Sequence, residues 1–452
     1  MSAAEPVLQS PRMRPRVLIV CEHASAQFGG EAALPLHYFR VLRSRGYDVW
    51  LITHARTRAE LVRLFPGEDR IHFVEDTRLH RLMWHISRFL PAKLAYISVG
   101  FVQRFACQLE ERRLARRLIA RHQIDLVHQP MPVSPREPSL MHGLGVPVVI
   151  GPMNGGLDYP PAFRRRSPLI ERLFMSVGRW SAAALNQLIP GKRRAAVLLV
   201  ANALTKRSLP SGVCTRVIEL VENGVDLSIW QRDSDSEPPS RPQAPVTFLF
   251  LGRLVDWKSV DLLLLAFHRA ARQATIRLMV VGDGAERERL QALATELGFP
   301  PGAGAGSSVA FTGWLSQVQA AEQLRLADCL VLPSLLECGG AVVLEAMCAG
   351  KPVIATAWGG PTDYLDDTCG LLVPPTGREE LIQGLADAMI RLASSPETRR
   401  AMGERGREKA RAEYDWEIKV DRVLEIYRQA LAPDVPLRSG RSTSRDAQTT
   451  LR

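Results

Sequence analysis

The chain has 452 residues, of which 46% are hydrophobic and 23% charged, a composition typical of a soluble globular protein. This length is too great for a single core and predicts two domains of roughly 200 residues each. Seven scattered cysteines without CxxC spacing exclude a disulfide framework and a zinc site, and they favour a reducing, cytoplasmic location.

The ends of the chain differ in composition from the middle. Residues 1–15 and 432–452 are polar and rich in Pro, Ser and Arg, so we expect both to be disordered. The apolar run that begins at Val17 is too short for a signal peptide and is predicted to be the first strand. The charge-free run from Leu94 to Gln103 has half the length that a membrane-spanning helix needs.

Between the ends, short β-branched and apolar runs alternate with longer helical patterns. Such runs are typical of buried parallel strands, because helices cover both faces of the sheet. The predicted strands of the first half are RVLIVC, DVWLIT, IDLVHQP, VPVVIGP, AVLLVAN and VIELVENGV, and those of the second half are VTFLFLGRL, IRLMVVGDG, VAFTGW, DCLVLPS and KPVIATA.

This pattern predicts an α/β protein with two doubly wound, Rossmann-like domains that face a central cleft. The Pro- and Ser-rich stretch 231–245 divides them as a linker, so the domains are 16–230 and 246–412. The helical pattern at 413–431 is predicted to return to the first domain.

The net charge of +11 is concentrated in two apolar segments, 80–105 and 164–194, the second of which holds eight Lys or Arg against one Glu. Such segments suit contact with an anionic membrane or anionic substrates, and they equally suit the solvated helix faces of a basic protein. No nucleic-acid motif is present, so we expect no nucleic-acid partner.

Two loops of the second half carry the residues of a candidate anion site. Arg253 and Lys258 lie between a predicted strand and a predicted helix, where two cations would neutralise a diphosphate, although both could simply be solvated. In the stretch ECGGAVVLE, Glu337 and Glu345 flank Gly339, Gly340 and Ala341 at a predicted helix start. Unpaired amides at such a start bind phosphate, and a carboxylate can accept hydrogen bonds from the vicinal hydroxyls of a ribose.

Four stretches together resemble the retaining glycosyltransferases of family 4, which have the GT-B fold. Their order along the chain matches that of the family, from about Val17 to Leu431. Residues 333–360 are similar to the E-x7-E signature, 252–267 to the phosphate loop, 221–230 to the Asn-Gly-Val-Asp hinge, and 28–53 to the glycine-containing first loop and helix.

The resemblance implies roles for individual residues. Arg253 and Lys258 would grip the donor diphosphate, and Glu345 would hold the ribose. Glu337 would lie beside the donor sugar with the amides of Gly339, Gly340 and Ala341.

Other residues would surround these groups. Gly29 and Gly30 would approach the donor from the first domain, and Gly282 and Gly284 would line the base pocket. His128 would lie near the sugar and the acceptor; from the residues alone, a strand-end histidine that satisfies backbone groups is the alternative. Asn154, Gly155 and Gly156 would shape the acceptor site, or form only a long turn.

The chain departs from the family at two points. The family commonly has Gly-Phe-Gly after the first glutamate, whereas this chain has Cys338-Gly339-Gly340, which leaves the donor sugar undefined. Asp363 stands where the family usually has Glu. The acid pair Asp233 and Asp235 falls in the linker and is not predicted to bind metal.

The resemblance implies a retaining, metal-independent hexosyltransferase without a cofactor. Its donor would be a nucleoside diphosphate sugar of the GDP-mannose or UDP-glucose type. Its acceptor would be a glycan or lipid-linked hydroxyl, in exopolysaccharide, lipopolysaccharide or glycolipid assembly at the cytosolic membrane face. Two alternatives remain open: a sugar-nucleotide epimerase of the same fold, and a non-enzymatic basic scaffold that binds membranes or nucleic acid.

Overall fold

The structure is a computed structural model that describes residues 14–28, 30–87, 99–132, 134–166, 181–230, 244–300 and 306–432. Several predictions fall wholly or largely outside these residues: the disordered ends, most of the linker, Gly29, and parts of both basic segments. No helix in the described ranges is long and apolar enough to cross a membrane.

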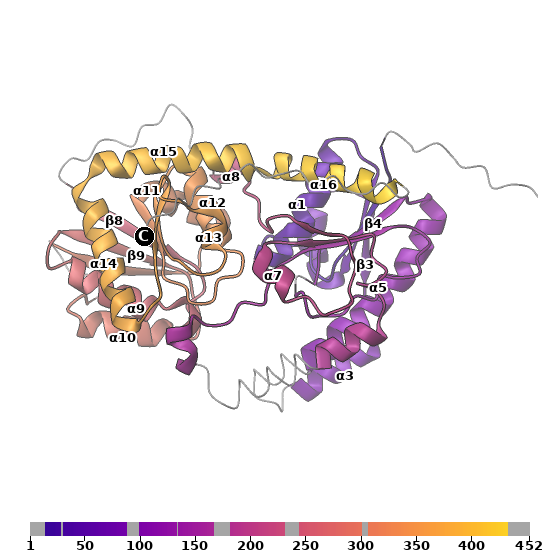
Figure 1. Ribbon diagram of the computed structural model, residues 1–452, viewed down its shortest axis with the longest axis horizontal. Helices are drawn as coiled ribbons and strands as arrows, with labels where there is room; N and C mark the ends of the chain where they lie inside the picture. Colours follow the sequence, from indigo (N-terminus) through magenta and orange to yellow (C-terminus); the bar gives the residue numbers. More distant parts are fainter. Residues whose placement is uncertain are drawn as a thin grey trace, which may run out of the picture.

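The two predicted Rossmann-like halves are present as two lobes (Figure 1). The first lobe is built on a seven-stranded sheet in the order β3-β2-β1-β4-β5-β6-β7, and every pairing in it is parallel. Its strands are β1 (Val17–Val20), β2 (Val49–His54), β3 (Ile71–Val74), β4 (Leu126–Gln129), β5 (Val148–Met153), β6 (Val197–Val200) and β7 (Val217–Glu219).

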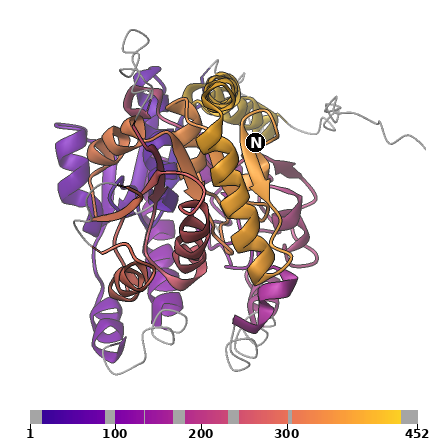
Figure 2. The ribbon, with the colours of Figure 1, turned by 90° about the vertical axis from the view of Figure 1, so that its left-hand side faces the viewer.

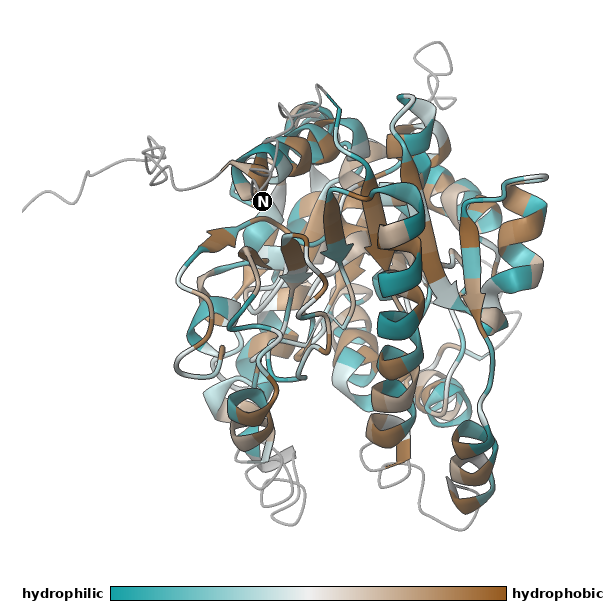
Figure 3. Ribbon diagram, turned by 90° about the vertical axis from the view of Figure 1, so that its right-hand side faces the viewer, coloured by the Kyte–Doolittle hydropathy of each residue, from teal (hydrophilic) through white to brown (hydrophobic). Residues whose placement is uncertain are grey.

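Helices of the first lobe cover the two faces of this sheet. They are α1 (Gly30–Ser44), α2 (Arg58–Leu64), α3 (Arg78–Ser87), α5 (Gly100–His122) and α7 (Ala203–Arg207), with short 3-10 turns η1 (Ala55–Thr57) and η3 (Pro161–Arg166). The strands are mostly apolar, with polar residues at some of their ends, whereas the helices alternate apolar and polar residues (Figure 3). This is the pattern of a sheet buried on both faces.

The second lobe repeats the plan with six parallel strands in the order β10-β9-β8-β11-β12-β13. The strands are β8 (Val246–Leu251), β9 (Ile276–Val281), β10 (Ser308–Gly313), β11 (Cys329–Leu332), β12 (Val353–Thr356) and β13 (Gly370–Val373). The other elements are α8 (Leu227–Trp230), η4 (Asp256–Lys258), α9 (Val260–Ala270), α10 (Arg287–Glu296), α11 (Gln317–Leu326), α12 (Ala341–Cys348), α13 (Pro361–Tyr364), α14 (Arg378–Ser394) and α15 (Pro396–Glu413).

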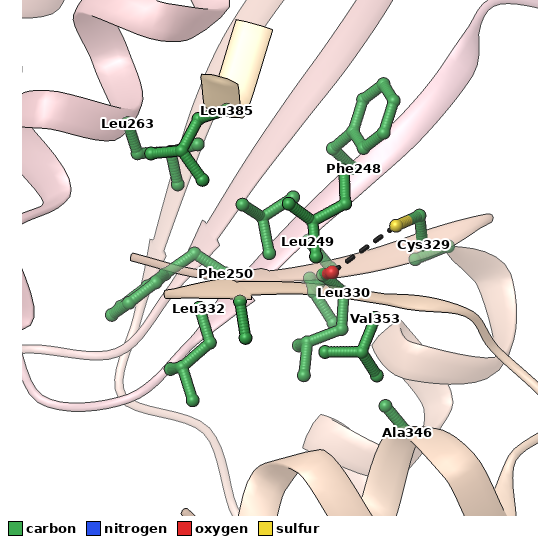
Figure 4. Close-up of a cluster of buried hydrophobic side chains, with 14 of the residues drawn as sticks. Phe248, Leu249, Phe250, Leu263, Cys329, Leu330, Leu332, Ala346, Val353 and Leu385 are labelled. Atoms are coloured by element: carbon green, nitrogen blue, oxygen red, sulfur yellow. Dashed lines mark hydrogen bonds between the residues drawn. The ribbon is translucent and has the colours of Figure 1, made fainter. Parts of the chain in front are cut away.

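The core of the second lobe lies around its two central strands. Phe248, Leu249 and Phe250 of β8 pack with Leu330 of β11 and Leu385 of α14, all fully buried (Figure 4). In an end-on view of this lobe, helices lie on both sides of the sheet (Figure 2). Because β8 and β11 are neighbours in space, the loops that leave their carboxyl ends are held together.

The last helix, α16 (Trp416–Leu431), continues from α15 and crosses to the first lobe, as predicted (Figure 1). Its residues Trp416, Val420 and Tyr427 belong to the core of the first lobe. Lys419 on the same helix is buried, and its ammonium donates to the backbone oxygens of Val221, Glu222 (2.6 Å) and Asn223 (3.4 Å). The returning helix therefore fastens the segment that connects the two sheets.

Candidate active site

Two neighbouring loops form one side of the candidate site. In each sheet the order of the strands changes direction next to the first strand, between β1 and β4 in the first sheet and between β8 and β11 in the second. Open α/β sheets bind ligands outside the carboxyl ends of the strands at such switch points. The loops after β8 and β11 carry the predicted residues of the second domain, and the amide of Leu335 donates to the oxygen of Trp257 at 2.9 Å.

Lys258 and Glu337 meet between these loops. The Lys258 ammonium forms an ion pair with the Glu337 carboxylate, and the two side chains are only 14% and 11% exposed. Gly340 follows in the left-handed conformation, with φ +68°, as the residue before α12. A cation, a carboxylate and the amino end of a helix therefore share one place in the fold.

Glycines let the Glu337 loop pack closely against its neighbours. The backbone amide of Gly360 donates to the backbone oxygen of Glu337 at 2.7 Å. A Cβ at Gly359 would lie 2.3 Å from that same backbone oxygen. A Cβ at Gly339 would lie 2.5 Å from the Asn223 side chain and 2.8 Å from the Glu222 carboxylate. A side chain at position 339 therefore has no room while Asn223 and Glu222 hold their places.

Glu345 lies in α12 beyond the glycines, and its side chain is half-buried. Burial raises the pKa of this carboxyl to about 8. No hydrogen bond or ion pair to its carboxylate is formed by any residue that the structure describes. An acid without a partner in an apolar helix is costly, and a hydroxyl-bearing ligand would offset that cost.

Arg253 is exposed on the loop after β8. Glu31, in the first turn of α1, lies across the cleft. Desolvation raises the pKa of Glu31, and the charge of Arg253 partly opposes this rise. Gly30 precedes Glu31, and a Cβ at Gly30 would have no atom within 4 Å, so this end of α1 borders open space.

Gly282 and Gly284 lie behind the Arg253 loop. A Cβ at Gly282 would lie 1.9 Å from the Gly252 oxygen, and one at Gly284 would lie 2.3 Å from the Leu254 oxygen. These glycines allow the turn after β9 to pack against the loop that carries Arg253.

The predicted acceptor loop reaches the Glu337 loop directly. The side-chain amide of Asn154 donates to the Cys338 oxygen at 2.9 Å and to the Glu222 carboxylate at 2.6 Å. The amide of Gly155 donates to the Thr205 hydroxyl at 3.2 Å. At Gly156 a Cβ would collide with Ser208, at 2.4 Å. The loop is therefore closely packed where the two lobes meet.

Asp363 also joins the lobes, because its carboxylate accepts a hydrogen bond from the Asn202 side chain at 2.8 Å. This hydrogen bond ties Asn202 of the first lobe to Asp363 of the second.

His128 is enclosed in the first lobe, and its place beside the substrate stays a prediction. The ring is fully buried in β4; Nε2 lies 2.6 Å from the Gly151 oxygen and Nδ1 lies 2.7 Å from the Tyr427 hydroxyl. Burial lowers its pKa to about 4. Both ring nitrogens have partners, so His128 ties β4 to β5 and to α16, which are the contacts that the alternative of a strand-end structural histidine predicts.

Glu222, which precedes the hinge asparagine, was not among the predicted site residues. Burial raises the pKa of its carboxyl to about 7, and the Asn154 hydrogen bond opposes this rise. Its position directly before the Asn-Gly-Val-Asp motif was the available signal.

Known proteins resemble this chain in two ways: a family model matches much of the second domain, and solved structures share the fold. Residues 231–409 match the family model described as glycosyl transferases group 1. D-inositol 3-phosphate glycosyltransferase from Nocardioides sp. is 33% identical over 229 residues, which cover 48% of this chain and 49% of that protein. The homologue from Saccharomonospora viridis is 33% identical over 235 residues, or 48% of this chain and 51% of its own. The chain thus spans about half the length of the curated relatives it matches.

Solved structures match over nearly the whole chain. Sucrose-phosphate synthase from Thermosynechococcus elongatus has a TM-score of 0.63 at 20% identity and covers 92% of this chain and 99% of its own. Anabaena HepE in complex with UDP-glucose has a TM-score of 0.61 at 17% identity, and the match covers 92% of this chain and 100% of HepE. The chain has the fold of GT-B glycosyltransferases.

Proposed function

We propose that the protein is a retaining glycosyltransferase of family 4 that moves a hexose from a nucleoside diphosphate sugar to an acceptor hydroxyl. The meeting of Lys258, Glu337 and the start of α12 at the switch point of the second sheet carries this proposal. A cation and helix amides suit a pyrophosphate, and a carboxylate suits sugar hydroxyls. The group 1 match to residues 231–409 supports it, because that segment contains both loops.

The main demand of the reaction is stabilisation of the leaving group. When the bond to the sugar breaks, negative charge grows on the diphosphate and positive charge on the anomeric carbon. Arg253, Lys258 and the positive end of the α12 dipole would stabilise the diphosphate without a metal ion. Glu337 would stay beside the sugar, since it already lies against Lys258.

The acceptor would attack from the face that the diphosphate leaves, and the departing phosphate would take the acceptor's proton. Glu345 would accept hydrogen bonds from the donor ribose, which would satisfy a carboxylate that has no partner among the described residues. Loops of both lobes border the site, so closure of the cleft would exclude water.

For the donor we favour a UDP-sugar of the UDP-glucose type, with GDP-mannose as the next choice. The structural match to HepE in complex with UDP-glucose supports the former. The acceptor would be a glycan or lipid-linked hydroxyl, and contact with an anionic membrane stays a prediction.

Release of nucleoside diphosphate from a panel of nucleotide sugars tests the proposal, with and without a mixture of oligosaccharide and lipid-linked acceptors. We expect one donor to be consumed faster with acceptor, and product NMR to show the donor's anomeric configuration. Conversion of donor alone into a second nucleotide sugar would identify an epimerase. Absence of both donor binding and turnover across the panel, with salt-sensitive binding to liposomes, would favour a scaffold.

A further inference from the structure

The first lobe has a pocket of about 330 Å³ at its own switch point, between the loops that follow β1 and β4. Four carboxylates and one arginine are among the residues that line it, together with Asn154: Glu22, Glu31, Glu111, Glu137 and Arg104. The chain as a whole carries +11, so this concentration of acids does not follow from composition.

The cations near the pocket neutralise these acids only in part. Arg104 is paired with Glu137, with 2.8 Å between Nε and Oε1. Lys192 lies behind the pocket, and its ammonium donates to the Pro135 oxygen at 2.6 Å. Among the described residues, Glu22, Glu31 and Glu111 form no ion pair with a lysine or arginine, although the charges of Arg104 and Arg56 act on Glu22 and those of Arg253 and Arg104 act on Glu31.

Glu111 has bonding capacity that the protein leaves unused. Its side chain is 1% exposed and lines the pocket from α5. The Cys107 thiol donates to Oε1 at 3.3 Å, and Oε2 has no partner among the described residues. Burial and then the charge of Glu22 raise the pKa of this carboxyl to about 8. A carboxyl group held in this way is stabilised by a ligand that brings a hydrogen-bond donor or a positive charge.

The pocket adjoins the site of sugar transfer. Asn154 lines it and also donates to the Cys338 oxygen, next to Glu337. Glu31 lines it and interacts with Arg253 across the cleft. A sugar in the pocket would therefore lie beside the proposed donor, on the side of the first lobe.

We infer that this pocket binds the acceptor and selects a sugar without negative charge, with preference for one that carries an ammonium group. The inference rests on the proposed function and adds the class of the acceptor. Hydroxyl or ammonium hydrogens would donate to Glu22 and Glu111, whereas a phosphate or carboxylate would meet the negative charges of Glu22 and Glu31. The matched relatives are named for an acceptor with a phosphate, D-inositol 3-phosphate, so this chain would differ from them.

The test uses three probes with the same ring: methyl glucosaminide, methyl glucoside and methyl glucuronide. Each is titrated against the full-length protein without donor, and binding is followed by ligand-observed NMR. We expect the glucosaminide to bind at least tenfold more tightly than the glucuronide, with the glucoside between them. In Glu22→Gln and Glu111→Gln this ratio should fall at least threefold, whereas Glu288→Gln, an exposed change on α10, should leave it unchanged.

Equal or tighter binding of the glucuronide would overturn the inference, as would a ratio that survives in both pocket variants, or no binding of any probe. Binding of UDP is measured on the same samples to show that the variants are folded. If UDP binds and the charge ranking fails, only the acceptor class falls. If UDP and nucleotide sugars fail to bind while the ranking holds, the proposed function falls instead.

Discussion

Replacement of Lys258 by alanine tests the leaving-group chemistry. The change removes the ammonium that contacts Glu337 and leaves that carboxylate, with 11% of its side chain exposed, without its ion-pair partner. We therefore expect two separate effects, one on turnover and one on stability.

The size of the first effect follows from electrostatics. Two unit charges about 4 Å apart interact by about 4 kcal/mol at an effective dielectric constant of about 20. Loss of one preorganised group that stabilises developing charge typically costs about 3–4 kcal/mol. Since Lys258 shares its charge with Glu337, we expect the lower part of this range, a fall in kcat of about 10²-fold.

The second effect separates chemistry from folding. A carboxylate left unpaired in a mostly buried place should cost about 1–3 kcal/mol in the free energy of unfolding. Glu337→Gln added to Lys258→Ala should restore much of this stability without restoring turnover. The assays are nucleoside diphosphate release and urea unfolding.

Lys206→Ala is a matched control, because Lys206 also faces a glutamate, Glu219 at 3.5 Å, but both side chains are about half exposed. It should change neither quantity by more than about 0.5 kcal/mol. Turnover of Lys258→Ala within threefold of the wild type would refute the proposed role of the lysine.

Three further changes test other parts of the site. Glu345→Gln should weaken nucleotide binding several-fold, up to about tenfold, in titration calorimetry, since a hydrogen bond to a neutral group contributes about 0.5–1.5 kcal/mol and a pKa of about 8 leaves this carboxyl largely neutral at pH 7. The same variant should be more stable than the wild type above pH 8 and similar near pH 4. In the folded protein the pKa of the Glu345 carboxyl is about 8, above its ordinary value of 4.5. The free energy of unfolding of the wild type therefore falls as the pH rises from about 4.5 to about 8. Gly339→Phe should abolish turnover, because the new side chain would collide with those of Asn223 and Glu222; turnover within threefold of the wild type would contradict this close packing. Lys419→Met should lower the free energy of unfolding by at least about 2 kcal/mol, because buried carbonyls lose their donor; an unchanged urea midpoint would contradict the fastening role.

Most of the fold follows from local pattern. Each of the eleven apolar runs predicted as strands contains one, because a parallel strand buried on both faces must be apolar throughout. The two strands that were missed, β3 and β13, lie at sheet edges. The sequence IHFV of β3 is mostly half-buried and includes a histidine, so it lacks the continuous apolar signal of the inner strands.

That the two loops predicted to bind the donor lie together could be predicted, because the strand order changes direction between the adjacent strands β8 and β11. Arg253 and Lys258 follow β8, Glu337 and Gly340 follow β11, and these strands are neighbours in any doubly wound sheet of this order. The strand order of the sheet, which brings these two loops together, therefore accounts for the contact of Lys258 with Glu337.

His128 and the acid pocket depend on contacts that no local pattern contains. The partner of His128, Tyr427, lies 299 residues away on the returning helix. Glu22 and Glu111 look like ordinary polar residues, one after a strand and one in a long helix. Only the pairing of β1 with β4 and the packing of α5 bring them to one pocket.

The most direct test of the donor site is a crystal structure of the protein with UDP or GDP bound, whichever binds more tightly. Our account predicts that the diphosphate lies between the Lys258 ammonium and the amides at the start of α12, with the ribose hydroxyls on the Glu345 carboxylate. A nucleotide bound elsewhere, with Lys258 still paired only to Glu337 and Glu345 still without a partner, would contradict it.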